Sequence, residues 1–225
     1  MAENDCCLII FAKEPVPGQV KNRLSSVLGQ ERAVSLYKAF LQDMHTLADV
    51  VPVRFRVLAY ESFGRIPNYL FSTFPHFIFY PQHGPDLGAR MADACLYAKH
   101  LGAKRVIIVG SDSPTLPPQL ITESFERLKD YDMVFGPCLD GGFYLLGLKA
   151  HLCEEAFENV AGKGRRAFAQ LRKNARDNEH SSFTLCHWYD IDGADDLEDM
   201  MNKTFSSIAA STNAVLRKIG KELLR

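Results

Sequence analysis

The sequence has no long apolar run and almost no net charge, and each absence excludes a class of protein. No stretch approaches the roughly 20 apolar residues that a membrane-spanning helix needs. The 225 residues carry a formal net charge of −1, so no overall field draws the chain to nucleic acid or to an anionic membrane. We therefore expect neither a nucleic-acid nor a membrane partner. Any affinity for anions must come from a local cluster of basic residues.

A secretion signal and paired-cysteine motifs are also missing. The first residues, MAENDCCLIIFA, lack the basic start and the long apolar segment of a signal peptide, which favours a cytoplasmic protein. None of the six cysteines forms a C-x-x-C pair. Because cytoplasmic proteins keep their thiols reduced, we expect buried, reduced cysteines rather than disulfides or a zinc site. The six are Cys6, Cys7, Cys95, Cys138, Cys153 and Cys186.

The composition is that of an ordinary soluble globular protein. Hydrophobic residues make up 47% of the chain and charged residues 24%, which allows a full core and a polar surface. The chain has no internal repeat, no low-complexity tract and no long linker. We therefore expect a single domain over residues 1–225.

Apolar periodicity predicts alternating strands and helices. Strands are expected over Cys6–Ala12, Val53–Tyr60, His76–Tyr80, Val106–Val109, Asp132–Gly136, Phe143–Leu148 and Phe183–Trp188. Helices are expected over Gln30–Ala48, Pro67–Phe74, Leu87–Leu101, Pro118–Leu128, His151–Val160, Arg165–Arg176, the segment that begins within 190–197, and Asn202–Arg225. This order favours an α/β fold, a three-layer α/β/α sandwich around a mostly parallel mixed sheet.

The stretch VIIVGSDSPTL is central to the argument. Val106–Val109 is an unbroken β-branched run, as expected of a strand buried on both faces, and Asp112 follows just beyond its carboxyl end. Ligands of open α/β sheets bind at that edge, and an aspartate there is a typical start of a magnesium or manganese site. The alternative is a simple turn or helix cap. We expect this strand to lie beside Cys6–Ala12 and parallel to it, with the strand order changing direction between the two.

A basic loop follows the first predicted strand. Its sequence from Lys13, KEPVPGQVKNRL, contains two prolines and a glycine, and it carries Lys13, Lys21 and Arg23. A strand, a basic loop and a helix start together make an anion cradle. The loop is not a Walker A motif, because G-x-x-x-x-G-K-[ST] is absent. The alternative is a solvated basic loop.

Further loops should reach the same edge of the sheet: 84–90, 137–142 and 190–192. They carry Arg90, Asp140 and Asp192, together with adjacent glycines at 141 and 142. A hairpin turn explains Asp-Gly-Gly nearly as well, and Asp192 could instead be a helix N-cap. The loops hold Lys or Arg, Gly and Asp, but no Cys–His or Ser–His–Asp set, which favours a metal-bound phosphate over acyl transfer.

Five motifs in this order resemble a known bacterial family. They are FAKEPVPGQVKNRL, GPDLGARM, VGSDSPTLP, FGPCLDGGFYLLGL and DIDGADDL. Together they resemble DUF2064, a glycosyltransferase-like family with the nucleotide-diphospho-sugar transferase (GT-A) fold. The KNRL stretch also resembles the basic loop of phospholactate guanylyltransferase, and DIDGADDL the aspartate-rich motif of related nucleotidyltransferases.

The resemblance implies a nucleotide at the carboxyl edge of the sheet. Asp112 matches the metal-binding aspartate of the superfamily, and we expect Asp192 to be the second ligand of Mg²⁺ or Mn²⁺. The expected catalytic residues are Asp112, Asp140 and Asp192. The expected nucleotide- and phosphate-binding residues are Ala12, Lys13, Gly18, Lys21, Arg23, Gly88, Arg90, Ser111, Gly141 and Gly142.

Two departures from the family pattern concern the substrates. Asn22 stands where family members usually have threonine. The stretch FENVAGKGRRAF (Phe157–Phe168) lacks the expected Trp-Ser-Thr pattern and carries Lys163, Arg165 and Arg166 instead. This region should border the acceptor, so the acceptor is the least transferable part of the resemblance.

Three functions agree with these residues. The first is a metal-dependent transferase that uses a nucleotide-sugar donor and a small-molecule acceptor. The second is a nucleotidyltransferase, in which Lys21 and Arg23 clamp the phosphates of a nucleoside triphosphate and pyrophosphate is released. The third is a non-catalytic nucleotide-binding protein. The fold serves the first two, so it cannot choose between them. The third predicts a broken acidic set, whereas Asp112, Asp140 and Asp192 are all present.

Overall fold

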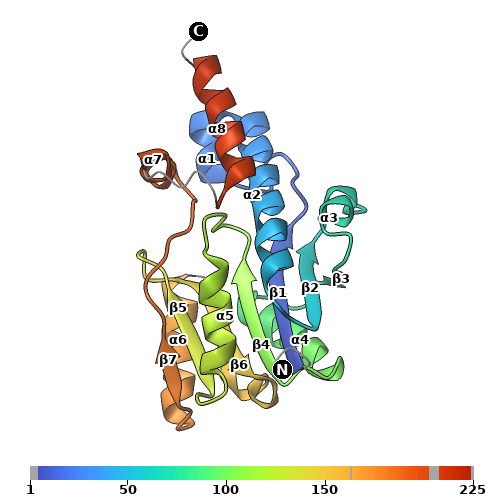
Figure 1. The fold of residues 1–225 in the computed structure, drawn as a ribbon, viewed down its shortest axis with the longest axis vertical. Helices are drawn as coiled ribbons and strands as arrows, with labels where there is room; N and C mark the ends of the chain where they lie inside the picture. Colours follow the sequence, from blue (N-terminus) through green and yellow to red (C-terminus); the bar gives the residue numbers. More distant parts are fainter. Residues whose placement is uncertain (1–4, 163, 203–207, 224–225) are drawn as a thin grey trace.

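The computed structural model describes residues 5–162, 164–202 and 208–223 (Figure 1). The strands are β1 (Cys6–Lys13), β2 (Phe55–Glu61), β3 (Ile78–Pro81), β4 (Arg105–Gly110), β5 (Met133–Pro137), β6 (Phe143–Lys149) and β7 (Ser182–Thr184). The α-helices are α1 (Asn22–Leu28), α2 (Gln30–Val50), α3 (Asn68–Thr73), α4 (Leu87–His100), α5 (Pro118–Arg127), α6 (Arg165–Asp177), α7 (Ala194–Asn202) and α8 (Ala210–Leu223). Within the described ranges, every helix is too short or too polar to span a bilayer.

The strands form one mixed sheet in the order β3-β2-β1-β4-β6-β5-β7. Strands β1 and β4 are parallel neighbours, with Ile9 paired to Ile108. From β1 the order runs outward to β2 and β3 on one side and to β4 on the other, so it changes direction between β1 and β4. Strand β6 is antiparallel to both β4 and β5. The predicted mostly parallel sheet, and the predicted pairing of its two central strands, are confirmed.

The alternation of side chains along β1 divides the core into two layers. Leu8 and Ile10 face one cluster, which includes the apolar faces of α2, α5 and α8. Cys7 and Ile9 face the other cluster, which includes α4 and α6. Figure 1 shows α2 and α5 in front of the sheet and α4 and α6 behind it. Because these four side chains of β1 are all buried, on both faces of the strand, helices must cover both faces of the sheet. The expected three-layer sandwich is confirmed.

Three predicted elements differ from the structure. The segment expected as a helix over 151–160 contains only two short 3₁₀ turns, η2 (Ala150–Leu152) and η3 (Glu155–Phe157). Asn174 of α6 explains part of this, since its Nδ2 donates to the carbonyls of Ala156 (3.0 Å) and Glu158 (2.8 Å). These side-chain bonds replace helical ones.

The last two differences lie near the C-terminus. The strand predicted over 183–188 shortens to β7 and a single bridge between Cys138 and Trp188. The helix predicted over 202–225 is observed as α8, while 203–207 and 224–225 lie outside the described residues. Asp43 of α2 accepts the backbone N–H groups of Ser211 (2.9 Å) and Thr212 (2.8 Å). Helix α8 therefore begins where α2 supplies a carboxylate to its first free N–H groups.

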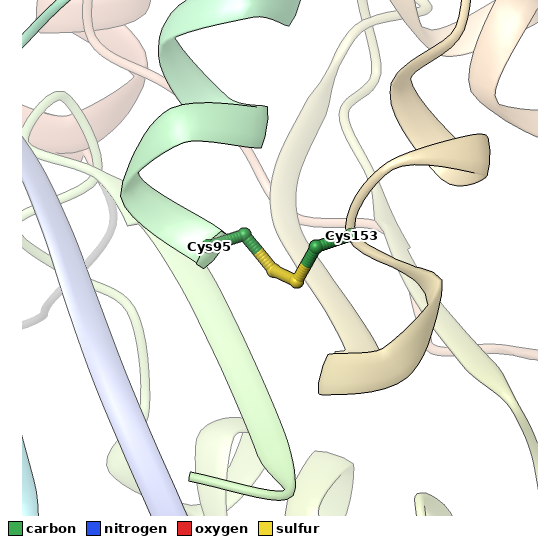
Figure 2. Close-up of a disulfide and its surroundings, with 2 residues drawn as sticks. All are labelled: Cys95 and Cys153. Atoms are coloured by element: carbon green, nitrogen blue, oxygen red, sulfur yellow. A yellow bond between two sulfur atoms is a disulfide. The ribbon is translucent and has the colours of Figure 1, made fainter. Parts of the chain in front are cut away.

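The prediction for the cysteines is wrong at two positions. Cys95 of α4 and Cys153, which follows η2, form a disulfide with Cα atoms 5.7 Å apart (Figure 2). The two residues are 58 positions apart in the sequence, and the packing of α4 against the η2 segment brings them together. No local cysteine spacing in the sequence predicts such a pair. Cys6, Cys7 and Cys138 are buried and lie outside this disulfide, as expected, whereas Cys186, also outside it, is exposed.

Removal of this disulfide should reduce stability substantially. The Cys95→Ala/Cys153→Ala variant is expected to lower the free energy of unfolding by about 2–4 kcal/mol, because the cross-link restricts a long loop of the unfolded chain. Urea unfolding of both proteins without reductant measures the difference. Thiol alkylation of the unfolded, unreduced wild type should label four of its six cysteines. Labelling of all six, or an unchanged free energy of unfolding, would contradict the assignment.

Asp132 fastens the ends of three strands together. Its carboxylate accepts hydrogen bonds from the backbone N–H (3.0 Å) and hydroxyl (2.7 Å) of Ser181, and from Lys149 Nζ (2.9 Å). Ser181 precedes β7 and Lys149 ends β6. The Ser181 hydrogen bonds, and then Lys149, lower the pKa of Asp132 to about 2.

This carboxylate should make stability depend on pH in the acid range. A lowered folded-state pKa means that the stabilisation is complete above pH 4 and is lost as the pH falls toward 2. Asp132→Asn should therefore cost about 1 kcal/mol at pH 7, a figure discounted for partial exposure, and clearly less at pH 3. Urea unfolding at both pH values tests this. An equal cost at the two pH values would indicate that the charge of Asp132 contributes nothing.

Candidate functional site

The five predicted loops meet around one cavity of about 680 Å³ at the carboxyl ends of β1 and β4. This is the point where the strand order changes direction, the usual ligand position in open α/β sheets. Most of the expected site residues line it, namely Ala12, Lys13, Lys21, Arg23, Arg90, Ser111, Asp112, Asp140, Gly142 and Asp192. The cavity therefore collects basic and acidic groups from segments that are far apart in the sequence.

Lys21 and two aspartates form the centre of the cavity. Lys21 Nζ lies 2.6 Å from Asp112 Oδ1 and 2.8 Å from Asp192 Oδ1, and it donates to the carbonyl of Ile191 at 2.7 Å. The lysine side chain is 4% exposed, whereas those of Asp112 and Asp192 are 43% and 51% exposed. The ammonium thus lies beneath the pair, and the carboxylates face the cavity.

Contacts from two sides hold Lys21 in this cluster. Lys21 precedes α1 with φ of 48°, a left-handed conformation that is uncommon for a residue with a side chain. Its ammonium lies over the ring of Phe40 in α2, 5.2 Å from the centroid. On the opposite wall, the N–H of Ile191 donates to the carbonyl of Asp112 at 2.9 Å. That bond holds the segment before α7 against the end of β4, so both aspartates reach the same lysine.

Asp192 does not act as the cap of α7. Its carboxylate is directed to Lys21, and Asp196 Oδ2 accepts the N–H groups of Asp192 (3.0 Å) and Gly193 (2.8 Å). The capping role that the sequence left open for Asp192 is therefore taken by a residue of the helix itself. This leaves the Asp192 carboxylate available to the cavity.

The charges in this cluster shift each other's pKa values. Burial alone would lower the pKa of Lys21, but Asp112 and Asp192 outweigh it and the pKa is raised. Burial likewise opposes ionisation of Asp192, yet Lys21 and then Arg23 hold its pKa below the usual range. Asp190, which also lines the cavity, behaves differently: burial raises its pKa to about 6, and Asp112 and Asp192 add to the effect. Its carboxylate contacts the Ser113 hydroxyl and lies 3.5 Å from Cys138 Sγ.

A second cluster of charged side chains lies on the side of the cavity toward β2 and β3. Glu61, at the end of β2, pairs with Lys13 Nζ at 3.1 Å and with Arg90 Nη1 at 3.3 Å. These partners outweigh the effect of burial and lower the pKa of Glu61. Gln82 Nε2 donates to the carbonyls of Ala59 (2.9 Å) and Ala12 (3.3 Å). The side chains here are thus held by one another.

Tyr37 of α2 supports the floor of the cavity. Its hydroxyl accepts the backbone N–H of Lys13 at 3.0 Å and lies 2.9 Å from Ser111 Oγ. Burial, and then the charge of Asp112, raise the pKa of Tyr37 to about 12. The phenol therefore stays neutral and links the end of β1 to the end of β4.

The Asp-Gly-Gly turn forms another wall of the cavity, where the acidic side chain of Asp140 lies near the basic side chain of Arg165. Asp140 Oδ1 accepts the N–H of Gly142 at 2.8 Å, and Arg165 Nη2 donates to the carbonyl of Asp140 at 3.0 Å. Gly141 has φ of +90°, and a Cβ at that position would lie 2.7 Å from Arg165 Nε. Gly164 lines the cavity beside this turn. One residue of the stretch that departs from the family pattern, Gly164, therefore lines the cavity, and the expectation that this stretch borders an acceptor stays a prediction.

Three of the expected nucleotide-binding glycines do not line the cavity. Gly18 lies in the turn of the basic loop, and Gly141 is covered by Arg165. Gly88 is packed against Val160, where a Cβ would approach the carbonyl oxygen to 2.0 Å. Its role is thus close packing of α4 against the chain at 160, a contact between distant segments that the loop sequence alone does not reveal.

The cavity residues that were not among the expected ones include Tyr37, Glu61, Gln82 and Asp190. Glu61 and Gln82 follow the ends of predicted strands, so the rule that selected Asp112 could have found them. Asp190 lies two residues before Asp192 and carries the same signal. Tyr37 belongs to the apolar face of a helix, and nothing in its spacing distinguishes it from a core residue.

The Asp112–Asp192 pair is suited to a divalent cation. Both carboxylates are about half exposed, and each contacts Lys21 through Oδ1, which leaves Oδ2. Hard oxygen donors of this kind fit Mg²⁺ or Mn²⁺, which take further ligands from phosphate and water. Within the part of the chain that the structure describes, no three His, Cys, Asp or Glu side chains gather into a ready-made metal cage.

Comparisons with known proteins place the chain in a family. The model of DUF2064, described as "Uncharacterized protein conserved in bacteria", matches residues 50–162, half of the chain. The chain belongs to the DUF2064 family. No curated protein sequence matches it.

Solved structures extend the comparison. A candidate nucleotide-diphospho-sugar transferase from Desulfovibrio desulfuricans G20 is 30% identical to this DUF2064 protein, with a TM-score of 0.84 over 96% of this chain and 98% of that one. A cytidylyltransferase from Leptospira borgpetersenii is 11% identical, with a TM-score of 0.62 over 97% and 96%. A CMP:2-keto-3-deoxy-manno-octonic acid synthetase complexed with CTP is 10% identical, with a TM-score of 0.57 over 88% and 97%. The last two similarities show the shared fold alone.

Proposed function

We propose that this DUF2064 protein is a metal-dependent transferase that takes a nucleotide-sugar as donor and a small molecule as acceptor. The observation that carries the proposal is the Asp112–Asp192 pair, open to a cavity at the switch point of the sheet and flanked by the basic loop. The 30% identical relative, a candidate nucleotide-diphospho-sugar transferase, supports the donor class. The cavity of about 680 Å³ lies in the range of small-molecule sites.

The residues of the cavity have separate roles in this proposal. Asp112 and Asp192 would hold Mg²⁺ or Mn²⁺, which stabilises the charge that develops on a departing diphosphate. Lys21 and Arg23 add positive charge beside the same phosphates, and an arginine can bind them in a bidentate manner. Together, the metal ion and the two basic side chains would supply fixed positive charge at the diphosphate oxygen that becomes negative as the bond to the sugar breaks.

The acceptor side is assigned to the wall around Asp140. An acceptor hydroxyl must lose its proton as it attacks the sugar carbon, and Asp140 lines the cavity where such a group would lie. Asp192 is less suited as the base, since Lys21 lowers its pKa and thereby its proton affinity. Arg165 lies beside this wall, so an acceptor that carries a negative group would find a positive partner there.

A second candidate function is nucleotidyl transfer from a nucleoside triphosphate. The basic loop favours it, because three basic residues in the cavity lining, Lys13, Lys21 and Arg23, match the charge of a triphosphate better than that of a diphosphate. The similarity in fold to cytidylyltransferases is compatible with it. In this reaction an acceptor phosphate attacks the α-phosphorus and pyrophosphate leaves.

The released product distinguishes the candidates. The protein is incubated with a panel of nucleotide-sugars and nucleoside triphosphates, together with Mn²⁺ and a mixture of small hydroxylated and phosphorylated acceptors. A nucleoside diphosphate, released faster with acceptor than by water alone, is the result expected of the glycosyl transferase. Pyrophosphate would instead establish the second function. Tight nucleotide binding without either product would indicate a non-catalytic protein.

The basic loop should contribute measurably to nucleotide binding. Arg23→Ala is expected to weaken binding of a nucleoside diphosphate by about 1.5–3 kcal/mol, the range for a hydrogen bond to a charged group. Calorimetry with Mn²⁺ present measures the change. Arg217→Ala is the matched control, because Arg217 is exposed on α8, away from the cavity. Equal affinities of the Arg23 variant and the wild type would remove this arginine from the site.

A further inference from the structure

The position between Asp112 and Asp192 already holds a positive charge. Lys21 Nζ contacts an oxygen of each carboxylate, at 2.6 and 2.8 Å, and it is anchored from behind by the carbonyl of Ile191 at 2.7 Å. The lysine is almost fully buried while the two carboxylates face the cavity. A protein-derived cation is therefore built into the site where the proposed function requires a metal ion.

We infer that Lys21 is an exchangeable internal cation, which weakens the binding of free divalent ions to the carboxylate pair, so that these ions bind readily only together with the diphosphate group of a nucleotide. The inference rests on the proposed function for the identity of the metal ligands. It adds an order of binding: the free protein has little affinity for Mg²⁺ or Mn²⁺, and the metal–diphosphate complex is the ligand that the site selects.

Charge balance supports this order. A free divalent ion that joins Asp112 and Asp192 meets the ammonium of Lys21 on the same two carboxylates, and like charges at such short range repel. The guanidinium of Arg23 also acts on Asp192, and it adds to the repulsion. A diphosphate brings negative oxygens with the metal, so Lys21 gains new partners when it yields part of its contact with the aspartates. Ion and lysine are then both neutralised.

The geometry allows Lys21 to exchange partners without unfolding the site. The Ile191–Asp112 backbone bond and the Asp196 bonds hold the two aspartates in place independently of the lysine. Lys21 reaches the pair through a flexible four-carbon side chain at the start of α1, so a change in its torsions moves the ammonium toward the cavity. A purely structural ion pair would show no such competition with metal.

Direct Mn²⁺ binding tests the competition without any substrate. Free Mn²⁺ is followed by electron paramagnetic resonance as it is titrated into the protein. Lys21→Met keeps most of the length of the side chain and removes its charge, so it should bind Mn²⁺ at least tenfold more tightly than the wild type. Lys149→Met, which removes a lysine that pairs with Asp132 outside the cavity, should bind like the wild type. The gain should vanish in Lys21→Met/Asp112→Asn.

The outcomes separate this inference from the proposed function. If Lys21→Met binds Mn²⁺ no more tightly than the wild type, or keeps its gain without Asp112, the inference is wrong. The proposed function stands or falls separately, on whether Mn²⁺ strengthens nucleotide binding by the wild type in calorimetry.

A measurement on the wild type makes the test independent of whether Lys21→Met folds. Brief acetylation with acetic anhydride, followed by peptide mass spectrometry, reports how accessible each lysine amine is. Lys21 should be protected in the free protein and should react several-fold faster at Mn²⁺ concentrations that fill the site, while Lys149 should not change. Constant protection of Lys21 at saturating Mn²⁺ would overturn the inference.

Discussion

Asp112→Asn is expected to abolish metal-dependent nucleotide binding while the protein still folds. The substitution keeps the shape of the side chain and removes the charge that faces both Lys21 and the cavity. We expect nucleotide affinity in the presence of Mn²⁺ to fall at least about 100-fold, which corresponds to about 2.8 kcal/mol. Calorimetry with and without Mn²⁺ measures the loss, and circular dichroism checks the fold.

The control for this prediction is Asp130→Asn, an exposed aspartate outside the cavity, which should bind as the wild type does. Asp192→Asn extends the test, because a metal ligand loses its function as an amide whereas a helix cap would tolerate asparagine. The contact between Asp192 and Lys21 leads us to expect a loss here too. Unchanged Mn²⁺ dependence in Asp112→Asn would show that the metal, if any, is bound elsewhere.

Gly88→Ala is expected to produce the largest loss of stability of any glycine-to-alanine substitution in the described part of the chain. A Cβ at position 88 would lie 2.0 Å from the carbonyl oxygen of Val160 and 2.8 Å from its Cβ. The oxygen belongs to the backbone, so it cannot rotate aside as a flexible side chain could. We expect the free energy of unfolding to fall by at least about 3 kcal/mol, the upper end of typical overpacking costs. Urea unfolding measures it.

Gly220→Ala is the matched control for the same change in a helix. No heavy atom lies within 4 Å of a Cβ built at Gly220, so the alanine should be neutral or should stabilise α8 by up to about 1 kcal/mol. If Gly88→Ala also proves neutral, α4 does not pack as closely against Val160 as the structure indicates. A stable Gly88→Ala variant with weakened nucleotide binding would instead return Gly88 to the binding residues that the sequence suggested.

The sequence by itself determined the two central strands of a mostly parallel sheet and the residues that gather at its carboxyl edge. The unbroken apolar runs of β1 and β4 can be satisfied only by burial on both faces, which requires central positions between two helical layers. The carboxyl ends of parallel strands share one edge, so the loops after them had to bring Lys13, Lys21 and Asp112 to the same side. These conclusions need only the periodicity of each segment and the rules of strand connection.

Only the tertiary structure decided which of these groups touch. The sequence predicted that Lys21 binds phosphate and that Asp192 binds a metal ion, but nothing in it showed that the two form an ion pair at 2.8 Å. It did not reveal that Cys95 forms a disulfide with Cys153, or that the backbone at Val160 packs so closely on position 88 that only glycine fits there. The physical reason is the same in each case: periodicity records which side of a segment faces the core, whereas a contact between distant segments depends on how the layers close upon one another.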